Sequence, residues 1–222
     1  MGRGIKNCGV KREDISITSK VGFYPPNCEG KIFPWDAGNE KGCEEASFDR
    51  CLKQLQVDYV DCLLVHTPVT SVLEFRAGYT PHFFEFAYEA EGTFYEKGTK
   101  IEPRQTIDGD DMMELICEAR MARHRNAGID FEQAYECRAK TWEAMEKFLK
   151  QGKAKMIGVS NYTPNLLQEM KTYASVMPAV NQLELTTSLQ HPRILKTAKE
   201  LGMVVSSYGI NRHVTYHMPP VL

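Results

Sequence analysis

The chain has 222 residues, and its 27 Lys or Arg residues nearly balance its 29 Asp or Glu residues, giving a formal net charge of -2. Apolar residues make up 42% and charged residues 25%, which is ordinary usage for a globular protein. This balance excludes a generally basic surface for nucleic acid, and no apolar run approaches the roughly 20 residues that span a bilayer. The length suits one or two domains, and one large α/β domain over residues 1–222 fits it as well. We expect neither nucleic acid nor a membrane as a partner.

The 7 cysteines are an odd number and include no Cys-x-x-Cys pair. In a chain of this size, that pattern is typical of reduced thiols inside the cell, and it disfavours both a disulfide framework and a zinc site. The N-terminal segment, Met1 to Lys6, has no apolar signal region. The sequence thus predicts a cytoplasmic protein without a bound metal.

Three regular segments are expected in the first third of the chain. The alternating, β-branched stretch Asp14 to Lys20 predicts a strand that ends at Lys20. After a loop from Val21 to Gly42 that is rich in Gly and Pro, apolar residues recur with helical spacing from Glu44 to Leu55. The short apolar run Asp58 to His66 predicts a strand that is buried on both faces, as in a parallel sheet.

The segment from about residue 70 to 138 interrupts this alternation and is expected to be an insertion after the strand that ends at His66. It is aromatic at first and then charged, with helices expected from Asp111 to Arg125 and from Phe131 onward. Two interpretations of its aromatic stretch, Phe83 to Tyr95, stay open. Either this stretch forms a lid or a surface for a protein partner beside the pocket, or it packs within the insertion.

Alternation then resumes and continues to about residue 209. Gly152 is expected to end a helix, and Thr163-Pro164 to begin the next one. The expected helices are Thr141–Lys150, Thr163–Tyr173 and Pro192–Leu201, the expected strands are Ala154–Val159, Ala179–Leu185 and Met203–Tyr208, and the tail of about 210–222 is expected to be irregular. Such alternation predicts a parallel α/β sheet, either doubly wound or in a (β/α)8 barrel. No Gly-x-Gly-x-x-Gly follows a strand, which disfavours the doubly wound alternative.

Polar side chains recur where the predicted strands end. They are Lys20, His66, Ser160-Asn161, Gln182 and Tyr208. In a parallel barrel the carboxyl ends of all strands open onto one face, so these side chains would converge on one pocket. Such a set suits acid–base work on a carbonyl or binding of a planar polar ring. The structural alternatives are a surface Lys, a core His, a turn at Ser160-Asn161 and a packing role for Tyr208.

Five segments resemble those of the aldo-keto reductase family. They are Arg12 to Lys20, Asp49 to Asp61 with the following Leu64 to Pro68, Trp142 to Asn161, Val180 to Glu184, and Gly202 to Tyr208. The resemblance covers residues 1 to about 68 and about 138 to 209, and its motifs lie at the ends of the expected strands in the expected order.

The resemblance implies a fold, a cofactor and a reaction. The fold is an incomplete (β/α)8 TIM barrel with about five matching strands and the helical insertion after His66. The cofactor is NADP(H), bound without a Rossmann motif, and the substrate is a small aldehyde or ketone that is reduced to an alcohol by hydride transfer. The protein must then supply a proton donor and a polar cradle for the negative charge that develops on the carbonyl oxygen.

The resemblance also implies a role for each polar strand end. Lys20 matches a lysine whose charge lowers the pKa of a tyrosine general acid, and His66 matches the histidine that orients the substrate carbonyl. Ser160, Asn161 and Gln182 match the residues that hold the nicotinamide carboxamide. Tyr208 matches the aromatic residue on which the nicotinamide ring stacks.

Several parts of the family pattern are not found in the sequence. The first two barrel strands, the tyrosine general acid and the acidic partner of the lysine have no counterpart, and Gly209 to His213 does not match the loop that holds the pyrophosphate. Cofactor binding is therefore expected to be weaker than is usual for the family, because charge-assisted phosphate contacts are lost. A second hypothesis follows, in which the chain is a catalytically silent binding or scaffold module.

Overall fold

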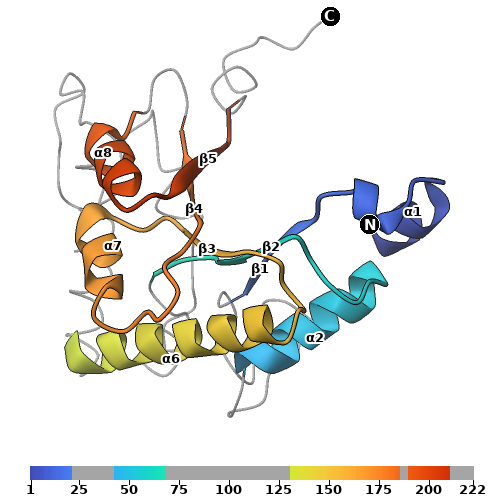
Figure 1. Cartoon of the computed structure of the whole chain (residues 1–222), viewed down its shortest axis with the longest axis horizontal. Coiled ribbons are helices and arrows are strands. Elements are labelled where there is room, and N and C mark those ends of the chain that lie inside the picture. Colours follow the sequence, from blue (N-terminus) through green and yellow to red (C-terminus); the bar gives the residue numbers. More distant parts are fainter. Residues whose placement is uncertain (22–42, 69–130, 186–189, 211–222) are drawn as a thin grey trace, which may run out of the picture.

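The computed structural model describes residues 1–21, 43–68, 131–185 and 190–210 (Figure 1). Strands and helices alternate along most of these ranges. The elements are helix α1 (Gly2–Asn7), a single 3-10 turn (Arg12–Asp14), β1 (Thr18–Val21), α2 (Cys43–Leu55), β2 (Cys62–Val65), α6 (Phe131–Lys150), β3 (Ile157–Ser160), α7 (Pro164–Met170), β4 (Val180–Glu184), α8 (Pro192–Glu200) and β5 (Val204–Tyr208).

The described strands form one parallel sheet in the order β1-β2-β3-β4-β5. Each strand is thus hydrogen-bonded to the next strand along the chain, and a helix-bearing connection lies between them, so the predicted parallel α/β class is confirmed. A doubly wound sheet reverses its strand order at a switch point. The described strands show no such reversal, and their order is that of an arc of a (β/α)8 barrel.

The helices cover one face of this sheet and bury its apolar side chains. In Figure 1, α2 and α6 run along one side of the strands, while α7 and α8 lie next to β3, β4 and β5. The rings of Phe48 on α2 and Phe148 on α6 have centroids 4.8 Å apart and are fully buried. They pack in one core with alternate strand residues, including Leu63, Val65 and Val159. Burying one such side chain contributes about 1.5–3 kcal/mol.

Local sequence signals set the ends of several helices. Thr163 accepts a hydrogen bond from the Leu166 N–H at the start of α7, and Pro164 occupies the first helical position, as predicted. Gly152 follows α6 with φ at +71°, a left-handed conformation that glycine adopts without steric strain. None of the described helices is long and apolar enough to cross a membrane.

Some predicted boundaries differ from the observed ones. The strand predicted from Asp14 begins only at Thr18, because the chain first makes a 3-10 turn in which the Arg12 guanidinium donates to the Ile15 carbonyl at 2.6 Å. The strand predicted from Asp58 is regular only over Cys62–Val65. Before it, Val60 forms an isolated parallel bridge with Ala154, which lies outside the regular strands.

The insertion and the tail lie mostly outside the described residues. The loop predicted from Val21 to Gly42 falls there from residue 22 onward, whereas Val21 itself is the last residue of β1. The predicted helix Asp111 to Arg125 and the tail beyond residue 210 fall there as well. The helix expected from Phe131 onward is confirmed, and it runs without a break into the one predicted at Thr141. Helix α1 was not predicted. It packs on α2, where a Cβ on Gly2 would lie 2.3 Å from the Gln54 carbonyl oxygen.

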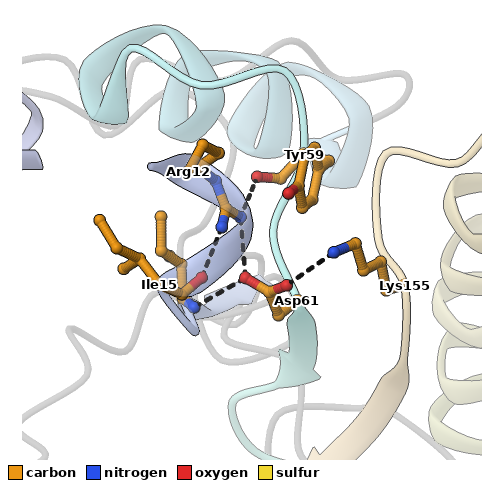
Figure 2. Close-up of polar contacts among 6 residues, drawn as sticks. Arg12, Ile15, Tyr59, Asp61 and Lys155 are labelled. Carbon is orange, nitrogen blue, oxygen red and sulfur yellow. Dashed lines mark hydrogen bonds and ion pairs between the residues drawn. The ribbon is translucent and has the colours of Figure 1, made fainter. Parts of the chain in front are cut away.

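A charged cluster joins the amino ends of β1, β2 and β3 (Figure 2). The Arg12 guanidinium donates to Asp61 Oδ2 at 2.8 Å and to the Tyr59 carbonyl at 2.8 Å. Asp61 also accepts the Ile17 N–H at 2.9 Å, and its second oxygen lies 3.2 Å from Lys155 Nζ. Burial raises the pKa of Asp61, but the hydrogen bonds from Ile17, Arg12 and Lys155 outweigh it, so that pKa lies below its ordinary value. The cluster therefore stabilises Asp61 in its charged form.

Candidate functional site

The strand register places three of the predicted site residues on the face of the sheet opposite the helices. Lys20 pairs with Leu64, Leu64 pairs with Gly158, and Ser160, two residues after Gly158, pairs with Gln182. Paired residues of adjacent parallel strands point the same way, and alternate residues share a face. Lys20, Ser160 and Gln182 therefore lie on the face that the apolar core does not use.

Tyr208 follows the same rule on the last described strand. It pairs with Glu184, which is two residues after Gln182, so it belongs to the same face. His66 comes directly after β2, in phase with Leu64, and its N–H donates to the Val21 carbonyl at 2.9 Å. Both residues therefore lie at the carboxyl ends of the strands, as expected.

Side-chain contacts connect these strand ends. Lys20 Nζ donates to Ser160 Oγ at 3.4 Å and lies 5.4 Å from the centre of the Tyr208 ring. Ser160 Oγ in turn donates to the Gln182 carbonyl oxygen at 2.9 Å. Strands β1, β3, β4 and β5 thus contribute to one polar cluster, in which Gln182 takes part through its main chain.

Asn161 connects the two remaining predicted residues, His66 and Tyr208, to this cluster. Its Nδ2 donates to the His66 carbonyl at 3.0 Å and to Ser160 Oγ at 3.1 Å, and its Oδ1 accepts the Tyr208 hydroxyl at 2.8 Å. The structure therefore brings all six predicted residues to the carboxyl ends of neighbouring strands.

The backbone of Asn161 explains how its side chain reaches this cluster. Strand alternation alone would place Asn161 on the helix-covered face, because it follows Ser160 directly. Its φ is +63°, a left-handed conformation that asparagine tolerates better than most residues. The Asn161 N–H still donates to the Gln182 carbonyl at 2.9 Å, so the turn is anchored to β4 while the side chain is redirected.

Two further residues that the sequence analysis did not single out support this end of the sheet. Gly158 leaves room for β4, since a Cβ there would lie 2.5 Å from the Val180 carbonyl oxygen and 2.8 Å from a Leu64 side-chain atom. Asn181 is fully buried, and its Nδ2 donates to the Tyr162 carbonyl at 3.0 Å. The sequence signals that could have identified them are a glycine inside an apolar strand, Gly158, and an asparagine inside another strand, Asn181.

Burial lowers the pKa of both basic residues at the site. It lowers the pKa of Lys20 below its ordinary value. It also lowers the pKa of His66, to about 4, with a further contribution from the nearby positive charge of Lys20. At neutral pH, His66 is therefore a neutral imidazole with one donor and one acceptor nitrogen. Among the described residues, no carboxylate forms an ion pair with Lys20.

The chemistry of the cluster suits a planar ring that carries a primary amide. Ser160 and Asn161 supply a hydroxyl and an amide, which both donate and accept hydrogen bonds, and the Tyr208 ring supplies an aromatic face. Within residues 1–21, 43–68, 131–185 and 190–210, no group of three or more His, Cys, Asp or Glu side chains is placed to hold a metal ion.

Two curated reductases are similar to most of the chain. An aldehyde reductase of Saccharomyces cerevisiae is 29% identical over 211 residues, which are 94% of this chain and 51% of that protein. The NAD(P)H-dependent D-xylose reductase of Scheffersomyces stipitis is 30% identical over 200 residues, which are 90% of this chain and 46% of that protein. The chain thus spans about half the length of each relative.

A solved structure and a family model agree with these similarities. The crystal structure of an aldo-keto reductase from Bombyx mori in complex with NADP has a TM-score of 0.54 at 18% identity, covering 99% of this chain and 50% of that one. This likeness supports the barrel-type fold. The model of the Aldo/keto reductase family matches residues 1–213. Because that match includes nearly the whole chain, the protein belongs to the aldo/keto reductase family.

Proposed function

We propose that this chain carries the nicotinamide end of an NADP(H)-dependent site that reduces a small aldehyde or ketone to an alcohol. One observation supports this most strongly. The Lys20, Ser160, Asn161 and Tyr208 side chains come from three strands and one strand-ending turn, yet they contact one another at a single end of the sheet. In parallel α/β folds, that end is where active sites form.

The cofactor assignment rests on the fit of these side chains to a carboxamide-bearing ring. Ser160, Asn161 and Gln182 would hold the carboxamide of nicotinamide, and Tyr208 would lie against the ring. When bound, the reduced cofactor supplies the hydride that the carbonyl carbon receives. The names of the two relatives, an aldehyde reductase and an NAD(P)H-dependent xylose reductase, favour the same assignment.

The substrate assignment rests on His66 and Lys20. A neutral His66 imidazole donates a hydrogen bond to the carbonyl oxygen of the substrate, and so holds the carbonyl in one orientation. The Lys20 ammonium stabilises negative charge that develops on that oxygen, because burial strengthens its electrostatic effect. Lys20 also donates the proton that completes the alcohol and regains a proton from solvent. Lys20 and His66 are thus the proposed catalytic residues, and the small-molecule carbonyl is the proposed partner.

A second candidate function is a catalytically silent binding or scaffold module with the same fold. It is favoured by the hydrogen bonds within the cluster, since both polar atoms of the Asn161 amide already have partners inside the chain. The insertion, about residues 70–138, would then provide the surface for a protein partner. A cytoplasmic location is proposed under either function.

Binding and turnover separate the two functions. Purified chain 1–222 is titrated with NADPH while cofactor fluorescence and circular dichroism are recorded, and NADPH oxidation is then followed with a small aldehyde. The reductase proposal expects saturable binding and turnover that Lys20→Met and His66→Ala both reduce. The exposed Lys53 on α2 provides the matched control, Lys53→Met, which should change neither. Folded chain that fails to bind NADPH would support the silent module.

A further inference from the structure

Lys20 differs from several other lysines of the chain in the groups around its amine. Those lysines lie within ion-pair distance of a carboxylate, in the pairs Lys147–Glu45, Lys153–Asp49 and Lys155–Asp61. Among the described residues, Lys20 pairs with no carboxylate, and its Nζ donates to the neutral Ser160 hydroxyl at 3.4 Å. No described anion therefore holds the Lys20 amine in its charged form.

The surroundings of the Lys20 amine act against its charge. Lys20 pairs in register with the fully buried Leu64, so its half-buried side chain leaves the sheet beside an apolar one. Burial lowers the pKa of Lys20, whereas contact with a carboxylate raises the pKa of Lys147 and Lys155. At neutral pH, a larger fraction of Lys20 than of those two lysines is therefore the free amine.

The hydrogen bond to Ser160 also orients the amine. When a free amine donates one N–H to Ser160 Oγ, its lone pair stays free to attack a carbonyl carbon. Ser160 Oγ is held in place by its own bond to the Gln182 carbonyl oxygen at 2.9 Å. The amine lies at the carboxyl ends of the strands, where ligands of parallel α/β barrels bind. A desolvated lysine amine in such a place is the nucleophile that forms imines with carbonyl compounds.

We propose that Lys20 is a covalent aldehyde-binding residue, whose Nζ forms a reversible imine with a small aldehyde at the carboxyl ends of the strands. The Nζ lone pair attacks the carbonyl carbon, and a proton passes from nitrogen to oxygen to give a carbinolamine. The hydroxyl then takes up a proton and leaves as water, and loss of the remaining N–H proton leaves a neutral C=N bond. One water is released, nothing is oxidised or reduced, and water reverses the sequence.

This activity goes beyond the proposed reduction, because it needs neither NADP(H) nor a hydride. The two reactions use different forms of Lys20. The ammonium stabilises charge and donates a proton during the reduction, whereas the free amine forms the imine. The imine site therefore remains even in a chain that binds no cofactor.

Reductive trapping tests the proposal on the folded chain. Propanal and sodium cyanoborohydride are added at neutral pH without NADPH, and the cyanoborohydride reduces each imine to a stable propylamine. Peptide mass spectrometry at short reaction times gives the rate of propyl addition at each lysine. Lys20 should be labelled roughly tenfold faster than the exposed Lys53 on α2, because more of it is free amine.

Three comparisons show whether the folded site causes this preference. In urea, Lys20 and Lys53 should be labelled at rates within about twofold of each other, since the unfolded chain no longer buries Lys20. Lys20→Arg keeps the positive charge and removes the amine, so label at this position should disappear while label at Lys53 is unchanged. Ser160→Asp places a carboxylate beside Nζ and should bring Lys20 down to the rate of Lys53, whereas the neutral Ser160→Asn should not.

Equal labelling of Lys20 and Lys53 in the folded chain overturns the proposal, and NADPH-dependent turnover by the same sample would leave the proposed reductase in place. A preference for Lys20 that persists in urea also overturns it, because the local sequence would then explain the rate. A preference that is lost in urea and in Ser160→Asp supports the imine site, even if the chain binds no NADPH. Circular dichroism identifies a variant that has not folded, in which case the urea comparison of the wild-type chain decides.

Discussion

The two ends of the sheet differ in whether they favour the charged forms of their ionisable side chains. At the amino ends of the strands, Asp61 receives hydrogen bonds from Arg12, Lys155 and Ile17, and its pKa is lowered toward the charged form. At the carboxyl ends, Lys20 and His66 also have lowered pKa values, but for these bases the shift disfavours the charged form. The first end therefore stabilises the charged form of Asp61. The second end disfavours the charged forms of Lys20 and His66, and such shifted pKa values are common in catalytic sites.

The partners at each end explain this difference. Arg12 and Asp61 contact each other directly and join the segments before β1 and β2, with Lys155 adding the segment before β3. Among the described residues, Lys20 has one polar contact, with the neutral Ser160 at 3.4 Å, besides the Tyr208 ring. The amino end is thus arranged for stability, while the carboxyl end retains polar groups that a ligand can use.

The largest expected effect comes from Lys20→Met. It should reduce NADPH-dependent carbonyl reduction roughly a hundredfold, as expected when a group that assists proton transfer is lost. Because Lys20 is half-buried without an ion-pair partner among the described residues, the free energy of unfolding should stay equal or rise. Steady-state kinetics and urea denaturation of the same preparation check both parts. A large loss of stability would mean that Lys20 is a structural residue.

A pH dependence of stability should arise from His66. Its folded pKa of about 4 lies below the unfolded value of about 6.5, so the unfolded chain binds more protons between these two pH values. Stability from the neutral His66 is fully present above about pH 6.5 and is lost as the pH falls toward 4, by up to about 3 kcal/mol.

The variant His66→Gln isolates this contribution. Since glutamine does not titrate, the slope of the unfolding free energy against pH should become shallower between about pH 6.5 and 4. Urea denaturation at several pH values measures the slope for both proteins. Equal slopes would show that His66 titrates alike in the folded and unfolded chains, which would remove the contrast between the two ends of the sheet.

Asp61→Ala is expected to lower stability and leave the site intact, the reverse of the result expected for Lys20→Met. Removing this carboxylate takes away the acceptor of the Ile17 N–H and the charged partner of the Arg12 guanidinium, which keeps its bonds to the Ile15 and Tyr59 carbonyls. The free energy of unfolding should fall by about 2 kcal/mol. NADPH affinity of the folded protein should not change, because the cluster lies at the far end of the sheet. Thermal denaturation and fluorescence titration are the two measurements. Loss of affinity with unchanged stability would reverse the roles assigned to the two ends.

The smallest effect is expected for Thr163→Ala. The Thr163 side chain accepts the Leu166 N–H at 3.5 Å and so caps α7, just after the turn that carries Asn161. Loss of this cap should lower stability by about 1 kcal/mol. Denaturant unfolding measures it, with the exposed Lys53→Met as the control. An NADPH affinity that falls along with stability would show that the cap also holds the Asn161 turn in place.

The sequence predicted most of the elements because their signals are local. Alternation of apolar strands and amphipathic helices gave the parallel sheet, and Thr163-Pro164 and Gly152 marked helix ends correctly. The start of β1 was predicted too early, since the turn at Arg12 depends on contacts with Tyr59 and Asp61, which are nearly fifty residues away in the chain. Hydrophobic periodicity does not report such pairs.

By itself, the sequence determined the parallel α/β class and the candidate residues at the carboxyl ends of the strands, because periodicity marks which segments are strands and which are helices. The barrel was implied by the resemblance, and the order of the strands in the sheet was given by the structure. Only the tertiary structure decided how those residues meet. The left-handed turn redirects Asn161 to the His66 carbonyl, 95 residues away in the chain, and to the Tyr208 hydroxyl. The lowered pKa of His66 was likewise decided by the neighbours that bury it, and a protonation state depends on surroundings that only folding assembles.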